Sequence, residues 1–173
     1  KDTPAGSNGV IFTPWLHGNR CPFEDSNARG MFINIGLDTG KTELIRSVLE
    51  GVCYHMRWML EAQEKKTKTS ETIRFVGGGA LSPVTCQILA DVLGRKLETV
   101  DNPQNVGAVG AAITAAAGLG IIDGIAQAEK LVTISHTYTP YGCNRKVYDA
   151  GFIVYKNLYR DNRRSFAACN SLL

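Results

Sequence analysis

Three glycine-rich segments contain residue types that can bind phosphate or nucleotide groups. The strongest candidate is Gly77, Gly78, Gly79, Ala80 and Ser82, in the run VGGGALS that follows a β-branched and aromatic stretch and precedes a helix start. Glycines let a flat group approach the backbone, and the free N–H groups of a helix start attract an anion. We therefore predict a nucleotide-binding turn here, and the alternative is a tight turn without a ligand.

A dinucleotide-binding oxidoreductase module is a second interpretation of the same turn. The pair Gly77 and Gly79 lies between a strand and a helix, and Asp101 at the end of the next predicted strand is placed to bind a ribose. However, Ser82 replaces the third glycine of that fingerprint, and no second βαβ half follows.

The other two glycine-rich segments are weaker candidates. Residues 36–42 look like a phosphate-binding P-loop, but Gly36 and Gly40 are separated by three residues, whereas a P-loop has about four. We expect a plain helix start there, with Asp38 or Thr39 as its N-cap. The small residues at 105–113 predict a helix that packs very closely on a neighbour, and a hinge or a contact with the nucleotide is the alternative.

No residue is assigned as catalytic. Asp25, Asp38 and Asp91 are better explained as a loop carboxylate, a helix cap and a structural support on a helix. His55 is expected to be a partly buried core residue. An ion pair is expected to hold the loop that carries Arg20 and Arg29.

No metal site is predicted either. The five cysteines are far apart and form no CxxC or CxxH pair, which favours a reducing, cytoplasmic setting. The longest uncharged run, residues 102–122, is too rich in glycine and alanine for a membrane span, and we expect it to form a buried helix.

The patterns around these segments predict alternating helices and strands, and therefore an α/β layer arrangement. Leu44, Val48, Val52, Met56 and Leu60 recur every four residues and predict one long core-facing helix over residues 41–65. The expected strands cover residues 10–12, 31–35, 72–76, 96–100 and 133–138. The other expected helices cover residues 83–93, 106–118, 125–131 and 146–166.

Composition is consistent with one globular domain. The chain has 173 residues, 44% of them hydrophobic and 20% charged, and a formal net charge of +3. This charge is too small to indicate binding to nucleic acid or to an anionic membrane.

Several motifs, taken in order, resemble the FGGY carbohydrate kinases, and most closely the xylulokinases among them. Residues 18–22 and 25–30 resemble the stretch GxRxP…DxNARG, and residues 46–52 resemble RAVLEGV. Residues 77–91 are similar to the adenosine motif GGGAxSxxxxQIxAD, and residues 107–112 look like the connecting helix of the sugar kinase and actin-like ATPase superfamily. The similarity covers about residues 9–159.

The resemblance implies a ribonuclease H-like fold and ATP-dependent phosphorylation of a sugar, such as D-xylulose or a related ketose or polyol, with Mg²⁺ as the companion ion. Gly77, Gly78, Gly79, Ala80 and Ser82 would line the adenosine side, while Gln87 and Asp91 would act as structural supports. A homodimer is compatible with the family, and so is a non-catalytic relative that binds nucleotide without turnover.

The resemblance also implies that residues 1–173 are a single nucleotide-binding portion of the C-terminal domain, incomplete at its N-terminal side. The N-terminal sugar-binding domain, the catalytic Asp and the phosphate loops would lie outside this chain, so the isolated chain is expected to be inactive. Two departures are noted. Asn19 stands where the family often has Glu, and two extra residues lie between Gly30 and Gly36.

Overall fold

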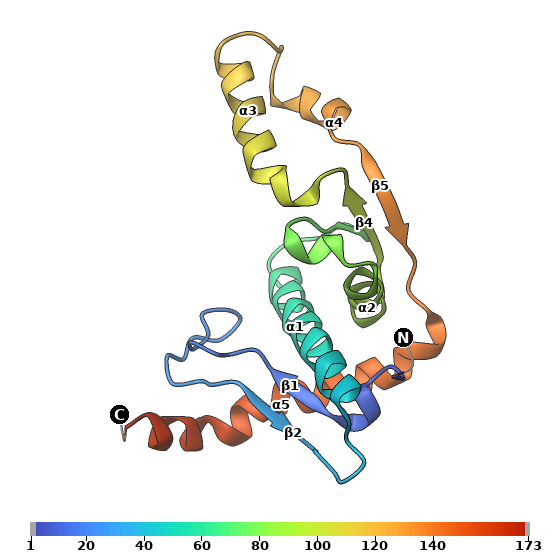
Figure 1. Cartoon of the computed structure of the whole chain (residues 1–173). Coiled ribbons are helices and arrows are strands. Elements are labelled where there is room, and N and C mark those ends of the chain that lie inside the picture. The colour runs from blue at the N-terminus through green and yellow to red at the C-terminus, as the bar shows by residue number, and fades with distance from the viewer. Residues whose placement is uncertain (1–2, 172–173) are drawn as a thin grey trace. The chain divides into compact units, whose positions relative to one another are not determined.

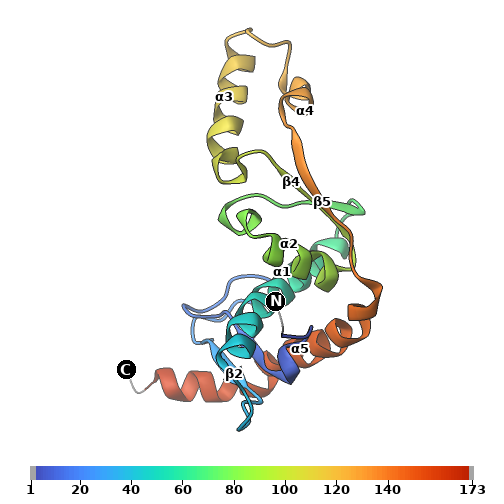
Figure 2. The same cartoon turned by 45° about the vertical axis from the view of Figure 1, so that its right-hand side comes forward.

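A computed structural model describes residues 3–171, apart from the side chains of Gln127, Glu129 and Lys130 (Figures 1 and 2). The chain forms two compact units. The first contains residues 1–69, 91–94 and 141–173, and the second contains residues 70–90 and 95–140. Each unit has its own sheet, and each is described separately below.

The first unit combines a short antiparallel sheet with two long helices. Strand β1 (Ile11–Thr13) pairs with β2 (Met31–Ile33), and the helices are α1 (Lys41–Glu64) and α5 (Arg145–Asn170). Gly51 allows α1 to lie directly on β1, since a Cβ at this position would clash with the carbonyl oxygen of Phe12. The predicted long helix is confirmed, and a glycine lies where it contacts β1.

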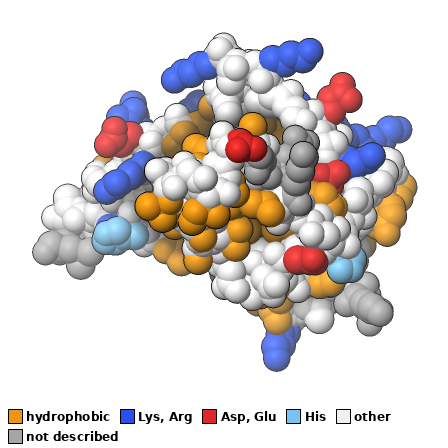
Figure 3. Space-filling view, turned by 90° about the horizontal axis from the view of Figure 1, so that it is seen from above, with side chains coloured by type: hydrophobic (Ala, Val, Ile, Leu, Met, Phe, Trp, Pro, Cys, Tyr) orange, Lys and Arg blue, Asp and Glu red, His pale blue; other side chains and the backbone are white. Residues whose placement is uncertain are grey.

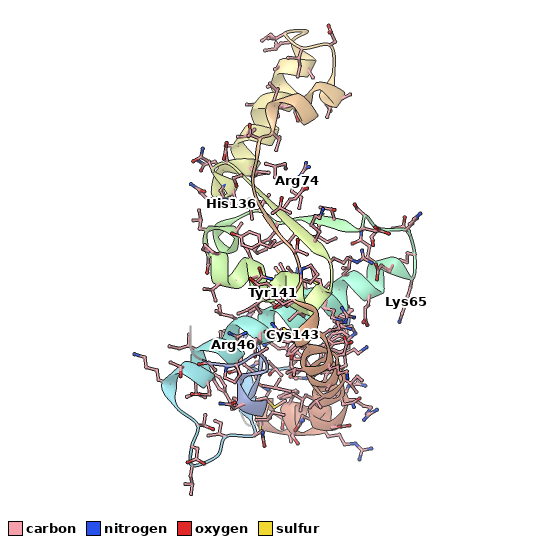
Figure 4. All side chains as sticks on the ribbon, turned by 90° about the vertical axis from the view of Figure 1, so that its right-hand side faces the viewer. Arg46, Lys65, Arg74, His136, Tyr141 and Cys143 are labelled. Atoms are coloured by element: carbon pink, nitrogen blue, oxygen red, sulfur yellow. The ribbon has the colours of Figure 1, made fainter. Side chains whose placement is uncertain are left out.

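A buried carboxylate connects three segments of the first unit. Glu50, 1% exposed, accepts hydrogen bonds from the Gly6 backbone at 2.9 Å, the Ser7 hydroxyl at 2.6 Å, Arg46 at 2.8 Å and the Tyr148 hydroxyl at 2.9 Å. Arg46 also donates to the Tyr148 hydroxyl at 2.9 Å (Arg46 is labelled in Figure 4). Burial and the neighbouring Glu50 charge raise the pKa of Tyr148 well above its usual value, so its hydroxyl stays protonated and can donate.

Aromatic side chains from α5 and from the segment after β1 pack together in the core of this unit. Trp15 is 1% exposed and contacts the rings of Phe23, Tyr155, Tyr159 and Phe166. Aromatic rings bury large apolar areas and prefer such tilted and edge-on contacts. The predicted final helix is confirmed, and it continues four residues beyond the predicted end at 166.

The second unit is built on a three-stranded sheet in the order β3-β4-β5. Strand β3 (Thr72–Arg74) is parallel to β4 (Lys96–Val100), and β4 is antiparallel to β5 (Ile134–Tyr138). Helix α2 (Pro83–Leu93) connects the two parallel strands, and its last residues, from Asp91 on, belong to the first unit. Helices α3 (Val106–Gly118) and α4 (Ala128–Leu131) lie between β4 and β5 in the sequence.

Helix α3 has the predicted bounds but not the predicted burial. None of its residues is buried, and Val109 is 42% exposed. Close packing was expected because the helix is rich in glycine and alanine, but no Cβ added at Gly107 or Gly110 would meet another atom within 4 Å. Hydrophobic side chains also lie at the surface in the space-filling view (Figure 3), and those of this unit that are exposed include Leu119, Ile121, Ile125 and Leu131.

Two smaller predictions about the first unit were also wrong. The N-cap of α1 is Gly40, and neither Asp38 nor Thr39 caps the helix. Arg29 holds its loop through the backbone carbonyls of Ser26 and Ala28, at 2.8 and 2.9 Å, in place of the expected ion pair.

The most buried face of α1 also differs from the predicted one. It consists of Ser47, Glu50, Gly51, Cys53 and Tyr54, while Val52 of the predicted apolar stripe is 38% exposed. The reason is that this face packs against β1 and α5 through close backbone contact and the Glu50 hydrogen bonds.

Candidate nucleotide site

The five predicted site residues all lie in one turn of the second unit, between β3 and α2. Phe75 continues the pairing with β4, donating its N–H to Glu98 at 2.8 Å, and Gly77 then turns the chain with φ +91°. A 3-10 turn over Gly78–Leu81 leads to Ser82. The Ser82 hydroxyl accepts the N–H of Thr85 at 3.3 Å, so the predicted cap at the start of α2 is confirmed.

The physical reason for glycine differs among the three glycine positions of this turn. Gly77 has a positive φ that favours glycine, and a Cβ at Gly79 would be 2.9 Å from the Phe75 ring. At Gly78 neither reason applies, because its φ is ordinary and a Cβ there would meet no atom within 4 Å. The backbone at Gly78 is therefore open to close approach from outside the described chain.

The end of the neighbouring strand lies against this turn. The carbonyl of Pro103 accepts the N–H of Gly77 at 2.8 Å, and Pro103 follows β4 after Asn102, whose φ is +46°. Parallel strands end at the same edge of a sheet, and ligands of open α/β sheets bind outside that edge. Since β5 is antiparallel, its first residues also lie at this edge.

A cavity of about 260 Å³ lies at this edge of the sheet. It is lined by Ala80, Leu81 and Pro83 on one side and by residues 99–103 and three residues of β5 on the others. Among the predicted site residues only Ala80 lines it, so the open backbone at Gly78 is a separate feature. Figure 4 labels Arg74 on β3 and His136 on β5, the two strands that flank β4.

Sequence reasoning missed the contribution of β5 to this cavity. Ser135, His136 and Tyr138 line it, and the Ser135 hydroxyl is 3.1 Å from that of Thr99. A strand pattern over these residues was visible, but its pairing beside β4 is a long-range property. The location of the residues after β4 could have been predicted from sequence. Parallel strands end at the same edge of a sheet, so Asn102 and Pro103 are expected near the turn.

The second glycine-rich segment, residues 36–42, does not have the properties of a phosphate site. The Glu43 carboxylate accepts the N–H of Gly40 at 3.1 Å and thus occupies the position at the start of α1 where an anion would bind. Hydrogen bonds from the backbone and from Thr42 lower the pKa of Glu43, which keeps it negatively charged. A phosphate would meet this charge, so the plain helix start is the better interpretation.

The residues expected to be supports do have supporting contacts. In the second unit Gln87 donates to the carbonyl of Thr139 at 2.9 Å. In the first unit Asp91, 3% exposed, accepts the Tyr141 N–H at 2.8 Å and the Asn144 amide at 2.7 Å. Both oxygens of Asp91 are thus engaged in holding the start of α5.

The other acidic and loop residues also have structural partners in the first unit. Asp25 accepts the N–H of Asn27 at 2.8 Å and the hydroxyl of Tyr159 at 3.1 Å. Asn19 donates to the carbonyls of Cys21 and Phe23 at 3.0 and 2.8 Å, which explains its place in the loop as a turn-shaping residue.

Two further properties concern the described part of the chain as a whole. None of the five cysteines, all of which lie within the described residues, forms a disulfide bond. Among residues 3–171, no helix combines the length and hydropathy needed to cross a bilayer.

Comparison with known proteins identifies the family. Residues 1–119 match the C-terminal domain of the FGGY family of carbohydrate kinases, and the chain belongs to this family. The predicted resemblance to the FGGY carbohydrate kinases is therefore confirmed.

Individual relatives agree with this assignment. The chain is 31% identical to a xylulose kinase of Bacillus subtilis (strain 168) over 157 residues, which are 90% of this chain and 31% of the relative. It is 35% identical to a glycerol kinase of Allorhizobium ampelinum over 136 residues, covering 76% of this chain and 27% of the relative.

The fold agrees as well. The structure of ligand-bound xylulose kinase from Lactobacillus acidophilus matches with a TM-score of 0.86 and 27% identity, over 96% of this chain and 34% of that one. The predicted fold class, that of the FGGY sugar kinases, is confirmed. The chain spans about a third of the length of the relatives it matches.

Proposed function

We propose that this chain supplies the nucleotide side of a carbohydrate kinase, which transfers the γ-phosphoryl group of ATP to a hydroxyl group of a sugar. Family membership supports the reaction class. The observation that carries the site is the open backbone at Gly78, since glycine there is required neither by its φ nor by packing within the chain.

Each residue of the turn has a definite part in this proposal. The backbone of residues 77–79 lies against the adenosine moiety, because without side chains it allows a flat group to approach closely. Ala80, 8% exposed, anchors the turn in the unit. The Ser82 oxygen already accepts the N–H of Thr85, so its hydroxyl proton is available to a ligand oxygen. ATP itself supplies the phosphoryl group.

Mg²⁺ is the ion that would accompany ATP in this proposal. No group of three or more histidines, cysteines or carboxylates within them is arranged to hold a metal ion. The ion that accompanies ATP in kinases usually contacts the phosphates together with one or two carboxylates. We therefore assign no step of the reaction to metal binding by this chain.

The substrate we propose is D-xylulose or a related ketose or polyol. Relatives named xylulose kinase support a ketose, and those named glycerol kinase support a polyol. We further propose that residues 1–173 act as one nucleotide-binding portion of the C-terminal domain. The sugar-binding domain, the catalytic Asp and the phosphate loops would then come from sequence outside this chain, and the chain by itself would be inactive. We also propose that the protein is cytoplasmic.

Calorimetric titration with ATP, ADP and NADH tests the nucleotide site. We expect weak binding of ATP and ADP, and no binding of NADH. Gly78→Val should abolish ADP binding because its side chain would fill the open approach to the backbone. The fold should be retained, since a Cβ at this position meets no atom within 4 Å.

The matched control is Gly36→Val. A Cβ at Gly36 also meets no atom within 4 Å, and this glycine belongs to the first unit. ADP binding should be unchanged in this variant. Equal ADP affinities for the Gly78→Val and parent chains, or binding of NADH in preference to ADP, would contradict the proposed site.

A further inference from the structure

A histidine of α1 and a tryptophan after β1 form a contact that the nucleotide site does not use. The indole Nε1 of Trp15 donates to Nδ1 of His55 at 3.3 Å, and the hydroxyl oxygen of Tyr155 is 3.2 Å from the same nitrogen. Trp15 and Tyr155 are fully buried, and all three residues belong to the first unit.

The contact requires neutral His55. An indole N–H can only donate, so the facing Nδ1 must carry a lone pair, and the ring proton must be on Nε2. Protonation of His55 places an N–H group at Nδ1. The Tyr155 hydroxyl can rotate and accept from it, but Trp15 cannot, and its buried N–H loses its acceptor.

The surroundings of His55 contain no compensating negative charge among the described residues. Burial lowers the pKa of His55 below its ordinary value of 6.5, and a hydrogen bond to the Cys21 backbone opposes this effect only in part. From α5 the titratable group facing the ring is Tyr155. Asp25, from the loop, accepts the hydroxyl of Tyr159.

The charged groups nearby on α1 also have partners elsewhere. Arg57 pairs with Asp149 at 2.8 Å, and Glu61 pairs with Lys156 at 3.1 Å. These pairs connect α1 to α5 and remain charged over the pH range in which a histidine titrates. They leave His55 as the group whose charge changes at this contact.

Trp15 also holds the loop of residues 17–30. Its ring meets Phe23 edge-on with centroids 5.3 Å apart, and Phe23 in turn stacks on Tyr159 at 3.6 Å. The loop is thus attached through Phe23, which contacts Trp15, Trp58 of α1 and Tyr159 of α5. Asp25 adds a hydrogen bond from the Tyr159 hydroxyl. A displacement of Trp15 would remove its contact with Phe23 and so weaken the attachment of the loop, whereas the Glu50 hydrogen bonds do not involve Trp15.

We propose that the Trp15–His55 hydrogen bond is a pH-sensitive attachment of the loop of residues 17–30, which is released when His55 gains a proton. A histidine that binds protons less well when folded than when unfolded stabilises the folded form above pH 6.5, and this contribution is lost as pH falls. Release therefore occurs on acidification.

The test uses Trp58→Phe in the full chain, which leaves Trp15 as its single tryptophan. The variant keeps an aromatic ring at the position where Trp58 contacts Phe23 and Tyr155. Acrylamide quenching of Trp15 fluorescence and the far-UV circular dichroism are followed from about pH 7.5 to about pH 5. We expect quenching to rise on acidification while the helical signal is retained. In the parent chain, the Trp15 indole N–H signal in NMR spectra should be lost over the same range, which gives a readout even if Trp58→Phe fails to fold.

His55→Gln keeps an acceptor but cannot titrate, so its quenching should not change with pH. His17→Gln and His136→Gln, which alter the other two histidines, should keep the transition of the parent. Quenching that is independent of pH, an identical transition in His55→Gln, or loss of the helical signal together with the change at Trp15 would overturn the proposal.

Discussion

At the residue scale, one buried carboxylate connects segments of the first unit, and one glycine leaves its backbone open to a ligand. Glu50 is buried and binds four donors from three segments, while Gly78 has open space on the side where a Cβ would point. The glycine run could be recognised in the sequence, because three adjacent glycines are costly in a simple turn. The role of Glu50 could not, because its partners Ser7 and Tyr148 are far away in sequence.

Glu50→Gln should lower the free energy of unfolding of the first unit. It removes the charge that Arg46 faces inside the protein, and breaking a buried pair in this way typically costs about 3 kcal/mol. Urea unfolding followed by circular dichroism measures the change. The control is Glu61→Gln, whose pairs with Arg57 and Lys156 are partly exposed and contribute at most about 1 kcal/mol. Equal losses for the two variants would contradict this role of Glu50.

At the scale of elements, local patterns predicted most of the helices and strands. The bounds of β4 and α3 agree with the expected ranges, and α1 ends one residue early, because their periodicity and flanking residues are local signals. The burial of α3 and the packed face of α1 were predicted wrongly, since burial depends on which surfaces meet. For the same reason, the turn at residues 77–82 was found from sequence and the lining of the nearby cavity by β5 was not.

Gly51→Ala tests the packing of α1 on β1. The added methyl group would clash with the carbonyl of Phe12, which as backbone cannot move without shifting the strand. We expect a loss of about 2 kcal/mol in the free energy of unfolding, within the usual cost of overpacking a core. Gly142→Ala, in the same unit and with nothing within 4 Å, should change stability far less. A neutral Gly51→Ala would mean that α1 and β1 are not in close contact.

At the scale of the molecule, the chain has two compact units and spans about a third of the length of its FGGY relatives. The proposed nucleotide turn belongs to the second unit, and the loop attached by Trp15 belongs to the first. Apolar residues of α3 remain exposed in the described chain, although the family match includes the whole helix. That the chain works as a single nucleotide-binding portion remains a prediction.

The most direct test of the nucleotide site is a titration of the isotope-labelled chain with ADP, followed through its backbone amide NMR signals. The account predicts that the largest shifts occur at residues 77–82, with smaller ones at 101–105, where the Pro103 carbonyl contacts Gly77. The amides of residues 36–42 should not respond, because Glu43 occupies that helix start. Shifts centred on residues 36–42, or no shifts at 77–82 at saturating ADP, would contradict it.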